Sequence, residues 1–239
     1  MSMPWPTASG PARNIFQTIG FAVLVAGSLL ATSTRASAHP HIWIDANAEM
    51  VFEKEKLTAI KMHWIFDDLF SMTLIDQFDK NFDTRFFGDE NTNVHDNAFV
   101  ALGDVSWLAH LRKNEILIPF TKTRDFKADI TDDRRVTYDF TLVLDEPLDP
   151  VKDNISLSVY DAEYYIDVAF VQVDPIVFRG NKTTSCHFEM SEDEKNRIYF
   201  DLVAPIRADL VCAAKQAQNQ SSLGPDAHGL NPDDMVRVD

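Results

Sequence analysis

Hydrophobic and polar residues alternate along residues 42–52, which is the pattern of a β-strand with one buried face. Residues 57–66 alternate in the same way, and the charged segment 53–55 between them predicts a turn. The apolar spacing then changes to that of a helix, which we expect over 67–78, and a weaker helical pattern runs from about 90 to 102. The first third of the folded chain is therefore predicted to be a hairpin followed by helices.

From residue 105 onward, short β patterns are separated by turn residues. The candidate strands span 106–112, 116–121, 126–130, 136–144, 155–160, 165–171, 176–178, 185–189 and 197–202. Short strands at this spacing are typical of an antiparallel sandwich. We therefore predict a mainly β (α+β) fold, an antiparallel β-sandwich with a helical, EF-hand-like insertion at about 67–102, after the second strand.

Residues 1–38 have the features of an export signal. Arg13 supplies a positive charge, residues 21–31 are apolar, and Ala36 and Ala38 match a signal-peptidase site. The apolar run is shorter than the roughly 20 residues that span a bilayer. We expect cleavage after this segment and a periplasmic protein.

The remaining chain is expected to form one β-rich domain at 39–212. The segment 213–239 is rich in Gln, Asn, Ser, Gly and Pro, which predicts a disordered tail. The formal net charge of -15 argues against nucleic acid or an anionic membrane as a partner, because both would repel the protein.

Cys186 and Cys212 are the two cysteines of the sequence. In an oxidising compartment a disulfide between them is the simplest expectation. On the chain-entropy model such a bond would stabilise the fold by about 3–4 kcal/mol. Two buried free thiols are the alternative.

The twelve-residue segment 79–90 has the spacing of a calcium-binding loop, with oxygen ligands at positions 1, 3, 5 and 12 and a backbone carbonyl at position 7. These positions hold Asp79, Asn81, Asp83, Glu90 and, for the carbonyl, Arg85. Position 6 holds Thr84, where the sharp turn calls for glycine. A left-handed conformation costs a β-branched residue about 1–2 kcal/mol. The alternative is an acidic connector that has kept the shape and lost the ion.

A different kind of site is suggested at the expected new amino terminus. The α-amine and the imidazoles of His39 and His41 are nitrogen ligands that suit zinc, nickel, cobalt or copper. Pro40 has no N–H, which excludes the square-planar site built on backbone amides. A three-residue turn would place Asp45 and His63 opposite each other on neighbouring strands, where they could complete the site. The alternative is a disordered polar stub before the first strand.

No phosphate-binding loop, nucleophile elbow or catalytic Cys–His pairing is present, so the sequence does not predict an enzyme. The remaining histidines are scattered and are interpreted as ordinary surface or core residues. They are His95, His110, His187 and His228.

Four segments carry a nearly full-length resemblance to a known family: AHPHIWIDA at 38–46, HWIFDDLFS at 63–71, DKNFD at 79–83 and SVYDAEYYIDVAF at 158–170. The chain resembles an uncharacterised family of exported bacterial proteins labelled "ABC-type transport system, periplasmic component". The resemblance implies a role beside nickel/cobalt permeases or zinc uptake systems. It carries over to His39, His41 and Asp45 and to the loop ligands Asp79, Asn81, Asp83 and Glu90, while Thr84 departs from the family's glycine.

Three functional hypotheses follow. The first is a periplasmic accessory protein that binds Zn, Ni or Co beside an inner-membrane metal permease or ABC transporter. The second is a non-catalytic structural or interaction module stabilised by calcium in the loop. The third, a copper enzyme with an amino-terminal histidine brace, needs a flat substrate face that the sequence does not display.

Overall fold

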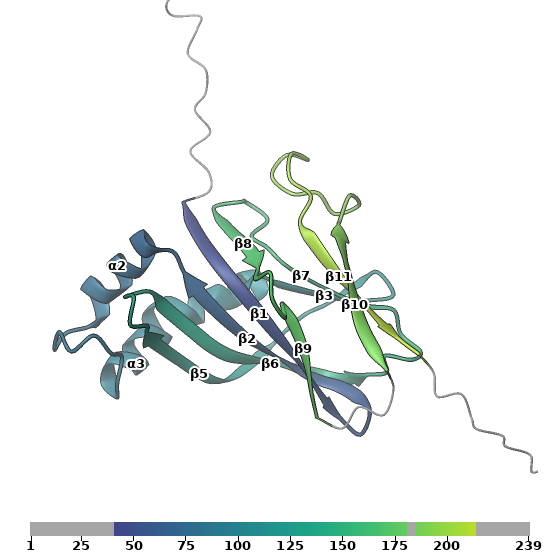
Figure 1. The fold of residues 1–239 in the computed structure, drawn as a ribbon, viewed down its shortest axis with the longest axis horizontal. Helices are drawn as coiled ribbons and strands as arrows, with labels where there is room; N and C mark the ends of the chain where they lie inside the picture. Colours follow the sequence, from purple (N-terminus) through teal and green to yellow (C-terminus); the bar gives the residue numbers. More distant parts are fainter. Residues whose placement is uncertain (1–40, 181–184, 214–239) are drawn as a thin grey trace, which may run out of the picture. The chain divides into compact units, whose positions relative to one another are not determined.

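The computed structural model describes residues 41–180 and 185–213, which form two β-sheets with helices beside the first sheet (Figure 1). Both sheets contribute to a common hydrophobic core. The mainly β fold and the helices after the second strand agree with the sequence prediction. The expected signal segment at 1–38 and the tail from 214 onward lie outside the described residues. No helix in the described part of the chain is long and apolar enough to cross a membrane.

The first sheet has the strand order β5-β6-β2-β1-β8, with β9 also paired to β1. Its strands are β1 (Ile42–Glu53), β2 (Lys56–Phe66), β5 (Lys122–Ile130), β6 (Val136–Leu148), β8 (Ile166–Phe170) and β9 (Ile176–Gly180). β8 and β9 run parallel to β1, so the prediction of a wholly antiparallel sandwich is wrong at this edge. Parallel pairing requires a long crossover, which the pattern within each strand does not reveal.

The register between β1 and β2 differs from the prediction by two residues. The turn consists of Lys54 and Glu55, both at positive φ, instead of three residues. A bulge at Thr58 then shifts the pairing once more, so that Asp45 lies opposite Ile65 and not His63. Each one-residue shift exchanges the faces of a strand, and two shifts restore them. The predicted faces are therefore correct although the predicted partners are wrong.

The second sheet has the order β10-β11-β7-β3-β4. Its strands are β3 (Ala109–Lys113), β4 (Ile116–Ile118), β7 (Ile155–Val159), β10 (Cys186–Glu192) and β11 (Ile206–Cys212). The predicted strand at 197–202 is wrong, because Tyr199, Phe200 and Asp201 have positive φ and turn the chain. The last strand of the described residues is β11, which the sequence did not predict.

The predicted disulfide is present. Cys186 and Cys212 lie directly opposite each other on β10 and β11, and their sulfur atoms are bonded. The bond joins the two ends of the last hairpin of the second sheet. It therefore closes a loop of the chain between them, which is the condition for stabilisation by reduced entropy of the unfolded state.

The inward faces of both sheets fill the core. Ala46 and Met50 of β1 alternate with polar outward residues, and Trp64 of β2 packs edge-on against Phe140 of β6, with ring centroids 4.8 Å apart. From the second sheet, Leu111, Leu157 and Leu210 face the same core. Burying side chains of this size contributes about 2–3 kcal/mol each.

The helical segment begins with α2 (Asp68–Phe78), as predicted, and continues with α3 (Asp89–Val94), a π-helix η1 (His95–Phe99) and a 3₁₀ segment η2 (Val100–Leu108). Asp67 caps α2 by accepting hydrogen bonds from the amides of Leu69 and Phe70. The second predicted helix is thus confirmed in position, but it is irregular and extends further. α2 and α3 lie beside β5 and β6 (Figure 1), and the loop between them is the calcium-like segment.

Candidate metal centre

The loop between α2 and α3 is held at both ends by helix termini. α2 ends where the amide of Asp79 donates to the carbonyl of Ile75 at 2.9 Å. α3 begins after Gly88, whose φ of 60° provides a turn that favours glycine. Phe78 and Phe86 are buried on either side of the turn and anchor it to the core. The loop is therefore a fixed part of the fold.

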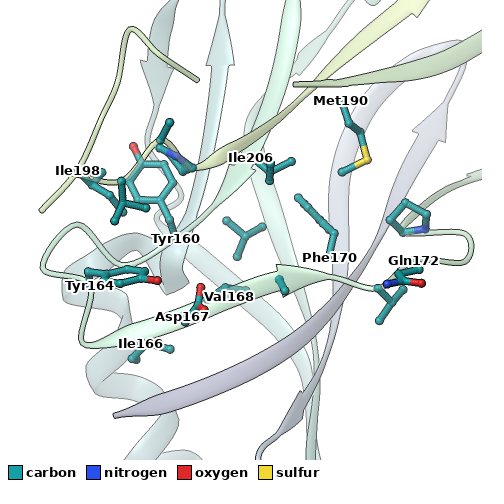
Figure 2. Close-up of a pocket in the computed structure, with 17 residues that line it drawn as sticks. Tyr160, Tyr164, Ile166, Asp167, Val168, Phe170, Gln172, Met190, Ile198 and Ile206 are labelled. Atoms are coloured by element: carbon teal, nitrogen blue, oxygen red, sulfur yellow. The ribbon is translucent and has the colours of Figure 1, made fainter. Parts of the chain in front are cut away.

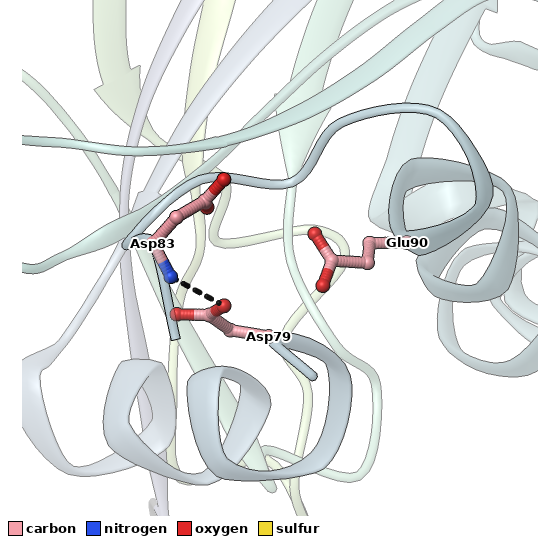
Figure 3. A group of neighbouring side chains, drawn as sticks. All are labelled: Asp79, Asp83 and Glu90. Atoms are coloured by element: carbon pink, nitrogen blue, oxygen red, sulfur yellow. Dashed lines mark hydrogen bonds between the residues drawn. The ribbon is translucent and has the colours of Figure 1, made fainter. Parts of the chain in front are cut away.

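Asp79, Asp83 and Glu90 converge in this loop, with one carboxylate oxygen of each within 4.8 Å of the others (Figure 3). Within residues 41–180 and 185–213 this is the one group of three or more His, Cys, Asp or Glu side chains with that geometry. Asp79 and Glu90 are only 2% and 8% exposed, while Asp83 is exposed. Two buried carboxylates and one at the surface make an oxygen-rich site that opens to solvent.

Backbone amides orient the two buried carboxylates. Asp79 accepts from the amides of Asp83, at 3.2 Å, and Thr84, at 3.0 Å. Oε1 of Glu90 accepts from the amides of Lys80, at 2.8 Å, and Asn81, at 3.2 Å. These contacts span the loop from its first residue to its last. The carboxylates are therefore positioned before any ion binds.

Oε2 of Glu90 is different. It is buried and has no hydrogen-bond partner among the described residues. The Glu90 carboxylate points toward Asp79 and Asp83 (Figure 3). A buried carboxylate oxygen without a donor is costly, because that atom has lost its hydrogen bonds to water and has no protein donor to replace them. A cation in the space between the three carboxylates would supply the missing interaction.

Three other loop residues matter for ion binding: Thr84 at the position that calls for glycine, and the predicted ligands Asn81 and Arg85. Thr84 has φ of 60°, so it adopts the left-handed conformation required at position 6 in spite of its β-branched side chain. The side-chain oxygen of Asn81 accepts from the amide of Asp83 at 2.8 Å, and its amide group donates to the Asp83 carboxylate at 3.2 Å. The side chains of Arg85 and Asn81 are both exposed.

The predicted amino-terminal site is not assembled in the same way. His39 lies outside the described residues. The ring of His41 packs against Tyr165, with centroids 4.8 Å apart. Asp45 forms an ion pair with Arg135 at 3.6 Å, and the register places it opposite Ile65. The predicted pairing of Asp45 with His63 is therefore wrong, because the shorter turn and the bulge displace it.

His63 instead pairs with Asp139 of β6, the strand on its other side. Nδ1 of His63 and Oδ1 of Asp139 are 3.0 Å apart, and both side chains are partly buried. Burial raises the pKa of Asp139, but the hydrogen bond and charge of His63, with nearby lysines, outweigh it and leave the pKa below its usual value. A cavity of about 280 Å³ adjoins the pair, and Glu49 and Asp174 also line it. Sequence reasoning missed Asp139, because only the pairing of β2 with β6 identifies it.

The other histidines in the described residues have ordinary partners. His95 contacts Asp96 at 2.7 Å, and His187 lies 3.5 Å from Glu189. His110 stacks on Tyr160 at a centroid distance of 3.7 Å, and burial lowers its pKa. His228 lies outside the described residues. None of these adds a ligand to the acidic loop.

The fold and the loop define the class of protein as a two-sheet β-protein that carries an acidic, oxygen-rich loop between two helices. The chain belongs to the family described as "Protein of unknown function (DUF1007)", which matches residues 24–224. No curated protein matches the chain. The family description assigns neither an activity nor a transport role, so the transport role expected from the sequence resemblance remains a proposal.

Proposed function

We propose that this chain is an exported, non-catalytic module that binds a calcium ion in the loop Asp79–Glu90. The observation that carries the proposal is the Glu90 carboxylate, which points toward Asp79 and Asp83 (Figure 3) and whose buried Oε2 has no hydrogen-bond partner among the described residues. A cation held there would contact both helix termini, because Asp79 ends α2 and Glu90 lies in the first turn of α3.

The donor chemistry favours calcium over a transition metal. The converging atoms are carboxylate oxygens, and calcium accepts six to eight oxygen ligands in a flexible geometry. The carbonyl of Arg85, the Asn81 side chain and water are available to complete such a shell. Zinc and nickel prefer nitrogen or sulfur ligands, which this loop does not contain.

A calcium ion in this loop would act mainly by stabilising the helical segment. The loop contains three carboxylates in close proximity, and binding would offset their mutual repulsion. Any ligand that binds the folded state alone stabilises it by mass action, by about 2.7 kcal/mol at a concentration one hundred times its Kd. The expected role is therefore to rigidify the surface that α2, the loop and α3 present to a partner.

The test is a calcium titration of metal-free protein followed by thermal unfolding. We expect calcium to raise the Tm by about 5–10 °C, and Glu90→Gln to abolish the rise. Asp89→Asn is the matched control, since Asp89 is an exposed neighbour outside the converging group and should leave the response intact. An equal rise in Tm with Glu90→Gln would contradict the proposal.

A second candidate function is the binding of Zn, Ni or Co for an inner-membrane metal permease or ABC transporter in the periplasm. The observation that favours it is the His63–Asp139 pair. A carboxylate that binds one imidazole nitrogen is the usual arrangement that orients a histidine toward a metal with its other nitrogen. The disulfide is compatible with export to an oxidising compartment.

Metal affinity separates the two candidates. Protein whose first residue has been verified by mass spectrometry is titrated with zinc, nickel and cobalt. If the transition-metal proposal is correct, the double change His39→Ala/His41→Ala or the single change His63→Ala weakens binding, and Glu90→Gln does not. Unchanged affinity in both histidine variants would defeat this second candidate and leave the calcium proposal untouched.

A further inference from the structure

A cleft opens between the edge of the first sheet and the last hairpin of the second sheet. Its volume is about 450 Å³. β8 forms one wall, and β10 with the segment 198–206 forms the other (Figure 2). The walls are mainly apolar, and the residues that line them include Tyr160, Val168, Phe170, Met190 and Ile206.

The cleft results from the way the two sheets meet. β8 is the last strand of its sheet, with β1 as its neighbour. Beyond it, Phe178 of β9 stacks on Phe188 of β10 with ring centroids 4.9 Å apart, which joins the sheets at that point. Beside β8, by contrast, Met190 and Ile206 remain 41% and 42% exposed. The apolar cleft is therefore a gap between the edge strand β8 of the first sheet and the edge strand β10 of the second sheet.

Asp167 is the one charged residue that lines this cleft within the described ranges. Its carboxylate is partly buried and has no hydrogen-bond or ion-pair partner among the described residues, and burial raises its pKa. The Tyr164 side chain lies beside it at the same end of the cleft (Figure 2). Burial, together with the charge of Asp167, raises the pKa of the Tyr164 hydroxyl. An isolated negative charge in an apolar cleft calls for a positive partner.

We propose that the cleft is a binding site for a small molecule that joins an apolar body to a protonated amine. The amine donates to the Asp167 carboxylate, and the apolar body covers Val168, Phe170 and Ile206. The volume lies within the roughly 300–1,000 Å³ range of small-molecule sites, and one charged group among apolar walls is their usual composition. The net charge of -15 also attracts a cation. This site is independent of the metal loop.

The experiment compares three probes that share one hydrocarbon chain: n-octylamine, 1-octanol and octanoate. Binding is measured by calorimetry with the full exported chain at about pH 8, where an amine is protonated and a carboxyl group with a raised pKa is ionised. We expect the amine to bind at least about tenfold more tightly than the alcohol, and octanoate to bind most weakly, because a charge-assisted hydrogen bond contributes this much.

Three variants assign the binding to the cleft. Asp167→Asn should reduce amine affinity to within about twofold of the alcohol, since only the charge is removed. Glu163→Gln, an exposed acid nearby that does not line the cleft, should change nothing. Ala169→Phe fills the cleft from an exposed position and should weaken amine and alcohol together.

Equal affinity for amine and alcohol in the native chain would overturn the proposal. So would an amine affinity that Asp167→Asn leaves unchanged, or the absence of binding by all three probes at about 1 mM. If Asp167→Asn does not fold, the probe comparison on the native chain decides the question together with Ala169→Phe.

Discussion

In the loop between α2 and α3, two acidic side chains are almost fully buried and are each oriented by two backbone amides. On the outer face of β1 and β2, by contrast, the charged side chains form separate pairs, Asp45 with Arg135 and the partly buried His63 with Asp139. The loop is built around a shared centre, whereas the strand face carries separate pairs.

The difference shows how each region depends on the rest of the fold. The loop ligands lie within twelve residues, so the local backbone determines their geometry. The strand residues meet only through the register of three strands, and one turn residue or one bulge changes which side chains are neighbours. The convergence of side chains therefore depends on the local backbone in the loop, but on long-range strand pairing on the strand face.

The largest expected effect comes from Glu90→Ala. This change removes the acceptor for the amides of Lys80 and Asn81 as well as the proposed ligand. We expect the free energy of unfolding to fall by about 2–3 kcal/mol even without calcium, because two partly buried donors lose their partner. Urea denaturation of metal-free protein measures it.

Glu90→Gln is the control for this prediction, because its side-chain carbonyl can still accept from the same amides. It should cost less than about 1 kcal/mol without calcium while still abolishing the calcium response. If both variants have the same stability, the amide contacts do not hold the loop, and the contrast with the strand face disappears.

On the strand face, His63→Ala is expected to cost about 1 kcal/mol at neutral pH. It removes a partly buried hydrogen bond between His63 and Asp139 and leaves the rest of the sheet intact. The calcium-dependent rise in Tm should be the same as in the native chain. A loss of that rise would mean that the two regions are coupled, contrary to their separate geometry.

Much of the fold follows from local patterns. The hairpin of β1 and β2 and most strands of the second half lie where the alternation predicts them, and α2 lies where the helical spacing predicts it. Four features do not, namely the parallel pairing of β8 and β9 with β1, the register between β1 and β2, the strand expected at 197–202 and the strand β11. Strand direction depends on long crossovers, and alternation within a single strand is silent about them.

The same division applies to the candidate sites. The spacing of Asp79, Asp83 and Glu90 predicts their convergence, because all three belong to one loop. The sequence does not predict a role for Asp139 or Asp167. Asp139 meets His63 only through the pairing of β2 with β6, and Asp167 lines a cleft that forms only where the two sheets meet. No residue near either of them in sequence signals that role.

A smaller effect is expected from Thr84→Gly. Thr84 is held at φ of 60°, where glycine is not strained. Removing the strain should raise stability by about 0.5–1 kcal/mol and tighten calcium binding severalfold, with part of the gain lost to the greater flexibility of glycine in the unfolded chain. Thr92→Gly, in the regular part of α3, should be destabilising instead and serves as the control.

The smallest effect concerns pH and separates the strand pair from the loop. The pKa of Asp139 is lowered in the folded chain, so the folded state binds fewer protons than the unfolded state. Its contribution is therefore present above the ordinary aspartate pKa of about 4 and is lost as the pH falls through the lowered value. In His63→Ala, Asp139 stays buried but loses the hydrogen bond and the charge of His63 that lower its pKa. The stability difference between native chain and variant, about 1 kcal/mol at neutral pH, should therefore shrink below about pH 4. Urea denaturation between about pH 3 and 7 measures this difference, and a value that does not change with pH would show that the ionisation of Asp139 is not coupled to His63.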